Sequence, residues 1–126
     1  MRAVDTNLLV RLITRDDARQ VARAEAFVAN GAWVSQLVLV ETTWVLDSVF
    51  RLGHAQIVLA VEMLLNHRDL VLQDSDVVTA ALARYRKRPR LGFSDCMVLA
   101  ISRKAGHLPL GTFDRHLGKL EGAQLV

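Results

Sequence analysis

The sequence predicts an α/β protein with three layers, in which helices cover both faces of a central, mostly parallel sheet of four or five short strands. Short apolar runs alternate along the chain with longer stretches of helical periodicity, and such alternation is typical of parallel sheets. Hydrophobic residues make up 52% of the chain, which is enough for a sizeable core. Its 126 residues have the length of one domain, so we predict that residues 1–126 form a single domain.

The elements follow in order from this pattern. Strands are predicted over residues 2–5, 32–34, 70–72, 108–111 and 123–126. Helices are predicted over residues 6–14, 17–30, 36–52, 54–67, 75–87 and 95–105. Ser35 and Ser94 are predicted N-caps, because their hydroxyls can accept a hydrogen bond from the first turn of a helix. Gly31 and Gly106 are predicted to end helices, since glycine adopts the left-handed backbone there without strain.

Charge and cysteine content exclude some classes of protein. The net charge of +3 is a mild indication of a polyanionic partner. The single cysteine, Cys96, excludes an internal disulfide and fits a reducing compartment. Asp5 and Arg11 interrupt the first apolar run, and no apolar stretch approaches the roughly 20 residues that cross a bilayer. We therefore predict a cytoplasmic protein with no membrane partner.

Four acidic residues stand apart from the other charges of the chain. Asp5 and Asp114 end or follow predicted strands, Asp95 begins a predicted helix, and Glu41 lies within an apolar helical stretch. Strand ends and the helix starts beyond them share one edge of a parallel sheet, so these acids are predicted to converge. Two carboxylates about 5 Å apart repel by roughly 3 kcal/mol at an effective dielectric near 20, so such a site takes up protons or a cation.

The cation that suits such a site is a hard divalent ion, Mg²⁺ or Mn²⁺, because all its ligands are oxygen atoms. The sequence has no cysteine–histidine cluster with zinc spacing. A metal site of this kind is suited to hydrolysis of phosphodiesters. Three of the acids taken singly also have a structural interpretation: Asp5 as a strand-end cap, Asp95 as a first-turn acid favoured by the helix dipole, and Asp114 as a turn residue. Glu41 is harder to explain in this way, because an unpaired acid on an apolar stretch of a helix is costly.

The same acids lie in four segments that resemble the motifs of PIN-domain nucleases. These segments are V-D-T-N-L-L at 4–9, V-E-T-T-W-V-L at 40–46, F-S-D-C-M-V-L-A at 93–100 and G-T-F-D-R-H-L at 111–117. Their order and spacing cover nearly the whole chain. A solitary PIN domain of this size is similar to VapC-type toxins, which cleave RNA and are silenced by a VapB-type antitoxin. The departures, at Gly111 and Cys96, touch no acidic position.

The resemblance implies a PIN-like fold and a metal-dependent endoribonuclease that acts as the toxin of a type II toxin–antitoxin pair. It implies Asp5, Glu41 and Asp95 as catalytic and metal-binding acids, with Asp114 as a fourth. Thr6, Asn7 and Thr112 are implied as supporting polar residues. The implied cofactor is Mg²⁺ or Mn²⁺, and the implied partners are RNA, a VapB-type antitoxin and a second copy of the chain. Cys96 is expected to be a small buried residue rather than a soft metal ligand.

A run of cations precedes the third acidic motif. Arg84 is followed by Arg86, Lys87, Arg88 and Arg90, and the last four are candidate contacts to the RNA backbone. The alternative is a solvated helix end whose cations complement the dipole. Tyr85 is a candidate for stacking on a base, although packing is the more common role of such a residue. His116 is expected on the surface, with a position near the acids as the alternative.

The predicted helices within residues 36–65 carry more apolar residues than a single buried face of each helix requires. Core packing accounts for most of them, but some can form a dimer or antitoxin surface. The candidates are Trp44, Phe50, Val58, Val61 and Leu65.

Three other functions compete with the toxin. A phosphoacceptor receiver module has an adjacent acidic pair after its first strand, whereas here Asp5 is followed by Thr6 and Asn7. A PIN-like binding module without catalysis and a PIN nuclease of RNA maturation both remain alternatives. A small upstream gene for a DNA-binding protein would favour the toxin.

Overall fold

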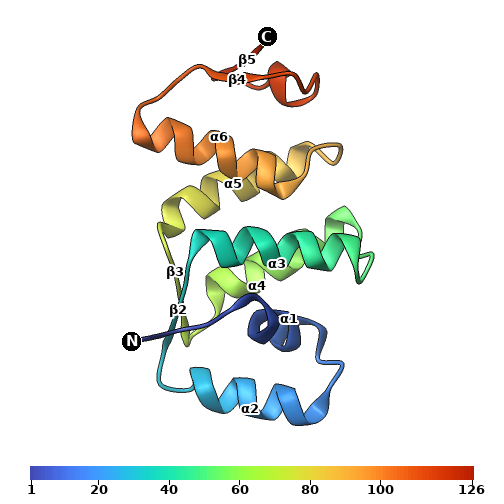
Figure 1. Ribbon diagram of the computed structural model, residues 1–126, viewed down its shortest axis with the longest axis vertical. Coiled ribbons are helices and arrows are strands. Elements are labelled where there is room, and N and C mark those ends of the chain that lie inside the picture. The colour runs from blue at the N-terminus through green and yellow to red at the C-terminus, as the bar shows by residue number, and fades with distance from the viewer. The chain divides into compact units, whose positions relative to one another are not determined.

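The computed structural model describes all residues from 1 to 126. The chain forms two compact units, unit 1 from Met1 to Ser75 and unit 2 from Asp76 to Val126. Helices and short strands alternate along both units, as the colour progression of Figure 1 shows. All five strands pair in parallel, which confirms the predicted strand direction. They form one three-stranded and one two-stranded sheet.

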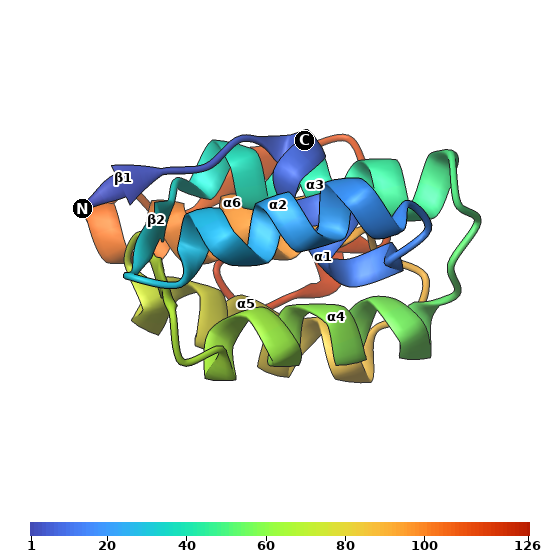
Figure 2. The same cartoon turned by 90° about the horizontal axis from the view of Figure 1, so that it is seen from below.

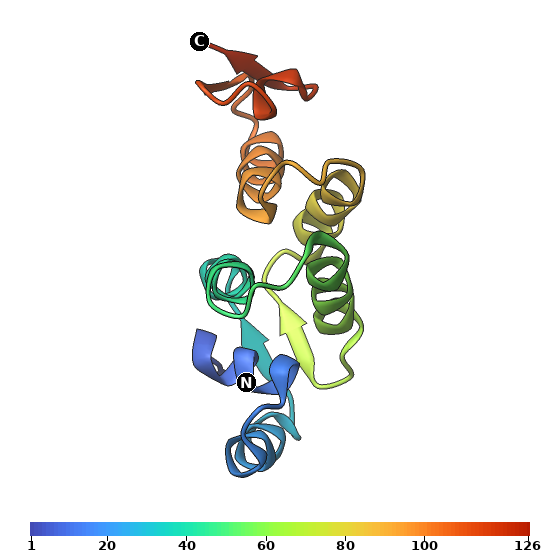
Figure 3. The same ribbon diagram turned by 90° about the vertical axis from the view of Figure 1, so that its right-hand side faces the viewer.

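Unit 1 contains the three-stranded sheet in the order β1-β2-β3. Its elements are β1 (Arg2–Ala3), α1 (Thr6–Thr14), α2 (Ala18–Val28), β2 (Ala32–Val34), α3 (Gln36–Ser48), α4 (His54–Asn66) and β3 (Leu70–Leu72). The register pairs Arg2 with Ala32 and Ala32 with Leu70. Helix α2 packs along α1 (Figure 2), and α4 packs against β3 (Figure 3).

Unit 2 contains α5 (Ser75–Lys87), which starts at the boundary, α6 (Phe93–Ala105), β4 (Leu110–Thr112), the 3-10 turn η1 (Leu117–Lys119) and β5 (Ala123–Leu125). Strands β4 and β5 pair from Leu110 with Ala123 to Thr112 with Leu125. Tyr85 of α5 meets Phe93 of α6 edge to face, with ring centroids 5.6 Å apart. Each unit contains fully buried apolar side chains, among them Leu9, Leu39 and Leu46 in unit 1 and Val78, Met97 and Leu99 in unit 2.

Several predicted boundaries are confirmed. Strands β2 and β3 and helix α1 have the predicted bounds. The Ser35 hydroxyl accepts a hydrogen bond from the Val38 N–H at 3.1 Å, as expected of an N-cap. Gly106 ends α6 in the left-handed conformation, with φ of 83°. Local capping and periodicity were sufficient at these positions.

Other boundaries were wrong by a few residues. The helix expected to reach residue 52 ends at Ser48, because Arg51 adopts a left-handed backbone with φ of 55°. Ser94 is not the N-cap of α6; Gly92 is, and its carbonyl accepts from the Asp95 N–H at 3.1 Å. The strand predicted to begin at residue 108 begins at Leu110, since Pro109 has no N–H for the ladder.

No helix of the structure combines the length and the apolar character that crossing a membrane requires.

Candidate active site

Asp5 caps the first helix of unit 1. Its Oδ1 atom accepts a hydrogen bond from the Leu8 N–H at 3.0 Å, which satisfies one donor that the start of α1 leaves unpaired. Asp5 is therefore the N-cap of a helix and not the strand-end cap that its structural interpretation predicted. The side chain is exposed, and its Oδ2 atom accepts no hydrogen bond.

Glu41 of α3 is connected to Asp5 through the intervening residue Thr6. The Thr6 hydroxyl donates a hydrogen bond to Glu41 Oε2 at 3.1 Å, across 35 positions of the sequence. Because Thr6 directly follows Asp5, this bond holds the start of α1 beside the second turn of α3. We refer to the two acids as the Asp5/Glu41 pair.

The surroundings of Glu41 differ from the expected apolar ones. The side chain is exposed, whereas the next two residues, Thr42 and Thr43, are buried. An apolar run along the sequence does not specify which positions of a helix face the core. The expectation that burial makes this acid costly was wrong, and its hydrogen bond with Thr6 is the feature that distinguishes it.

Asp95 and Asp114 form the second pair, in unit 2. Asp95 lies in the first turn of α6 and is half-buried. Burial raises the pKa of its carboxyl, and the negative charge of Asp114 raises it further, while a backbone hydrogen bond at Gly92 acts in the opposite direction. The influence of Asp114 on the Asp95 pKa is the like-charge interaction that a bound cation relieves.

Asp114 is held by a turn that leads into η1. Its Oδ1 atom accepts hydrogen bonds from the N–H groups of His116 and Leu117, both at 2.8 Å. Its own N–H donates to the hydroxyl of Thr112 at 2.9 Å. The predicted turn role of Asp114 is thus present, and Thr112 acts as a support for it. As in Asp5, Oδ2 accepts no hydrogen bond.

The other predicted site residues separate into distinct environments. Asn7 is exposed and lines a cavity of about 390 Å³ between α1 and α2, together with Arg11 and Phe27. Cys96 is fully buried, and burial raises the pKa of its thiol to about 11, so it stays protonated as expected of a packing residue. Tyr85 is 4% exposed, so the stacking interpretation was wrong and the packing interpretation is confirmed.

Of the apolar residues considered for a partner surface, Val61 belongs to the core, whereas Trp44 is 65% exposed.

The cation run of residues 86–90 contributes in part to a cavity of unit 2. Lys87, Arg88 and Arg90 line this cavity, but Arg86 does not. The cavity also includes His116, for which a position near the acids was the alternative, and Lys119, which sequence reasoning missed. No signal in the sequence identifies Lys119, because its side chain meets the run only through the fold.

The donor set fits a hard divalent ion. All four acids offer carboxylate oxygens, which Mg²⁺ and Mn²⁺ prefer. The structure contains no group of three or more histidine, cysteine or acidic side chains arranged around a metal position. Mg²⁺ is usually bound through one or two carboxylates, with water and substrate phosphates completing its shell. Two carboxylates, such as those of Asp95 and Asp114, are therefore the number of protein ligands that Mg²⁺ commonly uses.

Comparison with known proteins agrees with the motifs. The model of the PIN domain family matches residues 2–123. A solved structure that is similar to this chain is that of Mycobacterium tuberculosis VapC20, a Sarcin-Ricin loop cleaving toxin; the identity is 24%, the TM-score is 0.44, and the match covers 99% of this chain and 98% of that one. No curated protein sequence matches. Because the family model spans nearly the whole chain and both of its units, the protein belongs to the PIN domain family.

Proposed function

We propose that this PIN-domain protein is a divalent-metal-dependent endoribonuclease, with Asp5, Glu41, Asp95 and Asp114 as its catalytic and metal-binding residues. The observation that carries the proposal is the pair of Asp95 and Asp114 in a chain of this family: burial raises the pKa of the Asp95 carboxyl, and the negative charge of Asp114 raises it further. Repulsion between two carboxylates in one site is relieved when a cation binds between them, which supports a metal site here.

The residues have separable tasks in this proposal. The four acids would serve as ligands for Mg²⁺ or Mn²⁺, which when bound would lower the pKa of water and stabilise charge on the phosphoryl oxygens. The turn at Asp114 orients its carboxylate through the N–H groups of His116 and Leu117. Thr6 orients Glu41 through its hydroxyl. Asn7 and Thr112 are supporting residues, and the cations of residues 86–90 are contacts for the RNA backbone. The expected products are a 5′-phosphate and a 3′-hydroxyl.

The biological role that we propose is that of the toxin in a type II toxin–antitoxin pair, located in the cytoplasm. The support is the resemblance of this sequence to VapC-type toxins. The partners would be a VapB-type antitoxin, which inhibits the nuclease, and a second copy of the chain. Sedimentation of the purified protein tests the homodimer. Growth arrest on expression, relieved by the product of a small upstream gene, tests the toxin role against an RNA-maturation nuclease.

Cleavage of total bacterial RNA tests the nuclease directly. The purified protein, free of antitoxin, is incubated with the RNA in Mg²⁺ or Mn²⁺. EDTA and an Asp5→Asn variant are the negative controls. Asp47→Asn is the matched control, because it removes an exposed acid that lies on α3 like Glu41. Discrete products that vanish with EDTA and with Asp5→Asn, but persist with Asp47→Asn, are expected. Failure to cleave total RNA and defined transfer and ribosomal RNAs would favour a non-catalytic binding module.

A further inference from the structure

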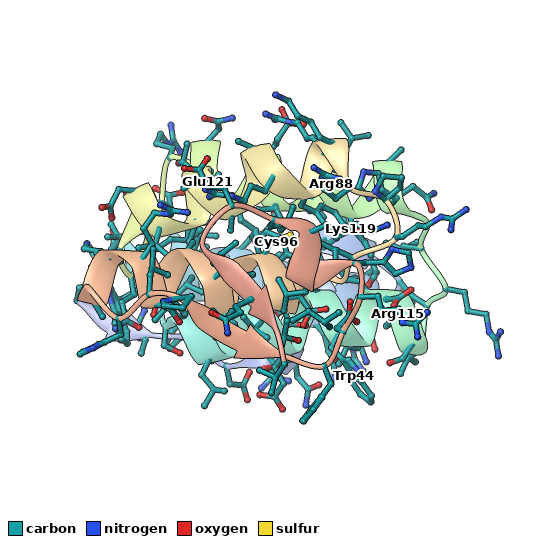
Figure 4. The ribbon with its side chains drawn as sticks, turned by 90° about the horizontal axis from the view of Figure 1, so that it is seen from above. Trp44, Arg88, Cys96, Arg115, Lys119 and Glu121 are labelled. Carbon is teal, nitrogen blue, oxygen red and sulfur yellow. The ribbon has the colours of Figure 1, made fainter.

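A cavity of about 220 Å³ in unit 2 gathers cations from two segments of the chain. One wall is the connection between α5 and α6, from Lys87 to Leu91. The other is formed by His116, the N-cap of the η1 turn, and Lys119, its last residue. Arg88 and Lys119, which Figure 4 labels, come from these two different segments, and both line this cavity. The cavity is therefore a tertiary feature and not a property of the basic run alone.

The charge of the cavity is entirely positive. Four of its lining residues are Lys or Arg, and none is Asp or Glu. Within unit 2, Arg103 donates to the Glu121 carbonyl and Lys104 pairs with Asp76. By contrast, the side chains of Lys87, Arg88, Arg90 and Lys119 take part in no hydrogen bond or ion pair. Cations gathered without partners repel one another, and an anion in the cavity relieves this repulsion.

Both walls of the cavity lead directly to the pair of Asp95 and Asp114. Leu91, which is 4% exposed, precedes the Gly92 N-cap of α6, and Asp95 lies in the first turn of that helix. His116 donates its backbone N–H to Asp114 Oδ1 at 2.8 Å. A ligand held in the cavity is thus adjacent to the segments that present both acids.

We propose that this cavity is a subsite for a backbone phosphate of RNA, which it holds next to the phosphodiester cleaved at Asp95 and Asp114. The inference rests on the proposed nuclease function. The planar guanidinium of Arg88 suits two phosphate oxygens at once, and Lys119 adds a point charge from the second segment that lines the cavity. Pro89, which is exposed and lines the same cavity, supplies an apolar surface for the attached sugar. Contacts of this kind fix the register of RNA without reading its sequence.

An acidic peptide is the competing occupant, since carboxylates also bind arginine. The position of the cavity favours RNA, because the substrate strand must pass the acids and its flanking phosphates then reach both walls. The proposal also refines the candidate RNA contacts: it retains Lys87, Arg88 and Arg90, adds His116 and Lys119, and leaves Arg86 out of the subsite.

The test measures RNA binding without cleavage. Wild type, the double variant Arg88→Gln/Lys119→Gln and the control Arg19→Gln/Arg68→Gln are titrated into a fluorescent single-stranded RNA in EDTA, at several salt concentrations. The control removes the same charge from exposed positions of unit 1. The slope of log K against log salt is negative, and each lost phosphate contact makes it shallower by about 0.7. The slope of the double variant should therefore be shallower by about 1.4, and that of the control should hardly change. If the double variant does not fold, the slope of Lys119→Gln alone should be shallower by about 0.7.

The outcomes separate this inference from the nuclease itself. In Mg²⁺, the double variant should raise KM and leave kcat close to that of wild type. An unchanged salt slope would overturn the subsite even if the protein cleaves RNA. Unchanged RNA binding with lost binding of a polyglutamate peptide would assign the cavity to a protein partner instead. Conversely, a salt slope that becomes shallower as expected in a protein that cleaves nothing would overturn the nuclease and leave the phosphate subsite in place.

Discussion

In unit 1 each of the two acids accepts a hydrogen bond from a neighbouring donor, whereas in unit 2 the negative charge of one acid acts on the other. Asp5 accepts from the Leu8 N–H and Glu41 from the Thr6 hydroxyl. In unit 2 the donors converge on Asp114, and its charge, together with burial, raises the pKa of Asp95. The Asp5/Glu41 pair is thus positioned by the protein alone, while Asp95 keeps an unfavourable charge that a cation can neutralise. The two pairs should therefore respond differently to substitution.

The largest effect is expected at Asp95. Asp95→Asn removes a proposed metal ligand, so RNA cleavage in Mg²⁺ should fall by at least roughly 100-fold. Loss of a residue that only hydrogen-bonds to a metal ligand costs up to about 100-fold, and loss of the ligand itself should cost no less. The stability of the metal-free protein should not fall, because the substitution removes like-charge repulsion. Cleavage rates and urea midpoints measured on the same preparations test both parts. Activity within a few fold of the Asp47→Asn control would exclude Asp95 from the site.

A smaller loss of activity is expected at Thr6. Thr6→Val keeps the size of the side chain but removes the hydroxyl that donates to Glu41. Cleavage should fall by about 10-fold, as for other residues that orient a metal ligand. Thr6→Ser restores the donor and should recover most of the rate. If valine and serine variants behave alike, the hydrogen bond does not position Glu41.

Two substitutions of Asp5 distinguish its role as an N-cap from its proposed role in catalysis. Asp5→Ala removes the N-cap of α1 and should lower the free energy of unfolding by about 1 kcal/mol, whereas Asp5→Asn keeps a good capping side chain and most of the stability. Both variants should lose RNA cleavage. Urea denaturation and cleavage assays check this pattern. Equal stability of the alanine and asparagine variants would show that the bond to the Leu8 N–H contributes little.

The smallest effect is a dependence of stability on pH in EDTA. Because the folded protein raises the pKa of Asp95 above its ordinary value of 3.8, this group contributes stability that is fully present below pH 3.8 and is lost as the pH rises through the raised pKa. The stability of Asp95→Asn relative to wild type should therefore increase over that interval and then level off. Partial exposure of Asp95 makes the change small. A flat difference between the two proteins would argue against a raised pKa of Asp95 in the folded protein.

The sequence by itself determined the parallel α/β pattern, the bounds of β2, β3 and α1, and the acids of the four motifs. These features depend on short-range physics: periodicity, the Ser35 cap and the freedom of Gly106 at a helix end. The motifs also carried the family resemblance, which the match over residues 2–123 confirms.

Only the tertiary structure decided which of these groups meet. The bond between Thr6 and Glu41 and the cavity shared by Arg88 and Lys119 each join segments distant in the sequence. The exposure of Glu41 and the burial of Tyr85 against Phe93 depend on how the helices pack. The contribution of Asp114 to the raised pKa of Asp95 likewise depends on the fold, which brings the two carboxyl groups within electrostatic range. Burial and the approach of charges depend on how separate elements pack, and no pattern within a single element contains that information.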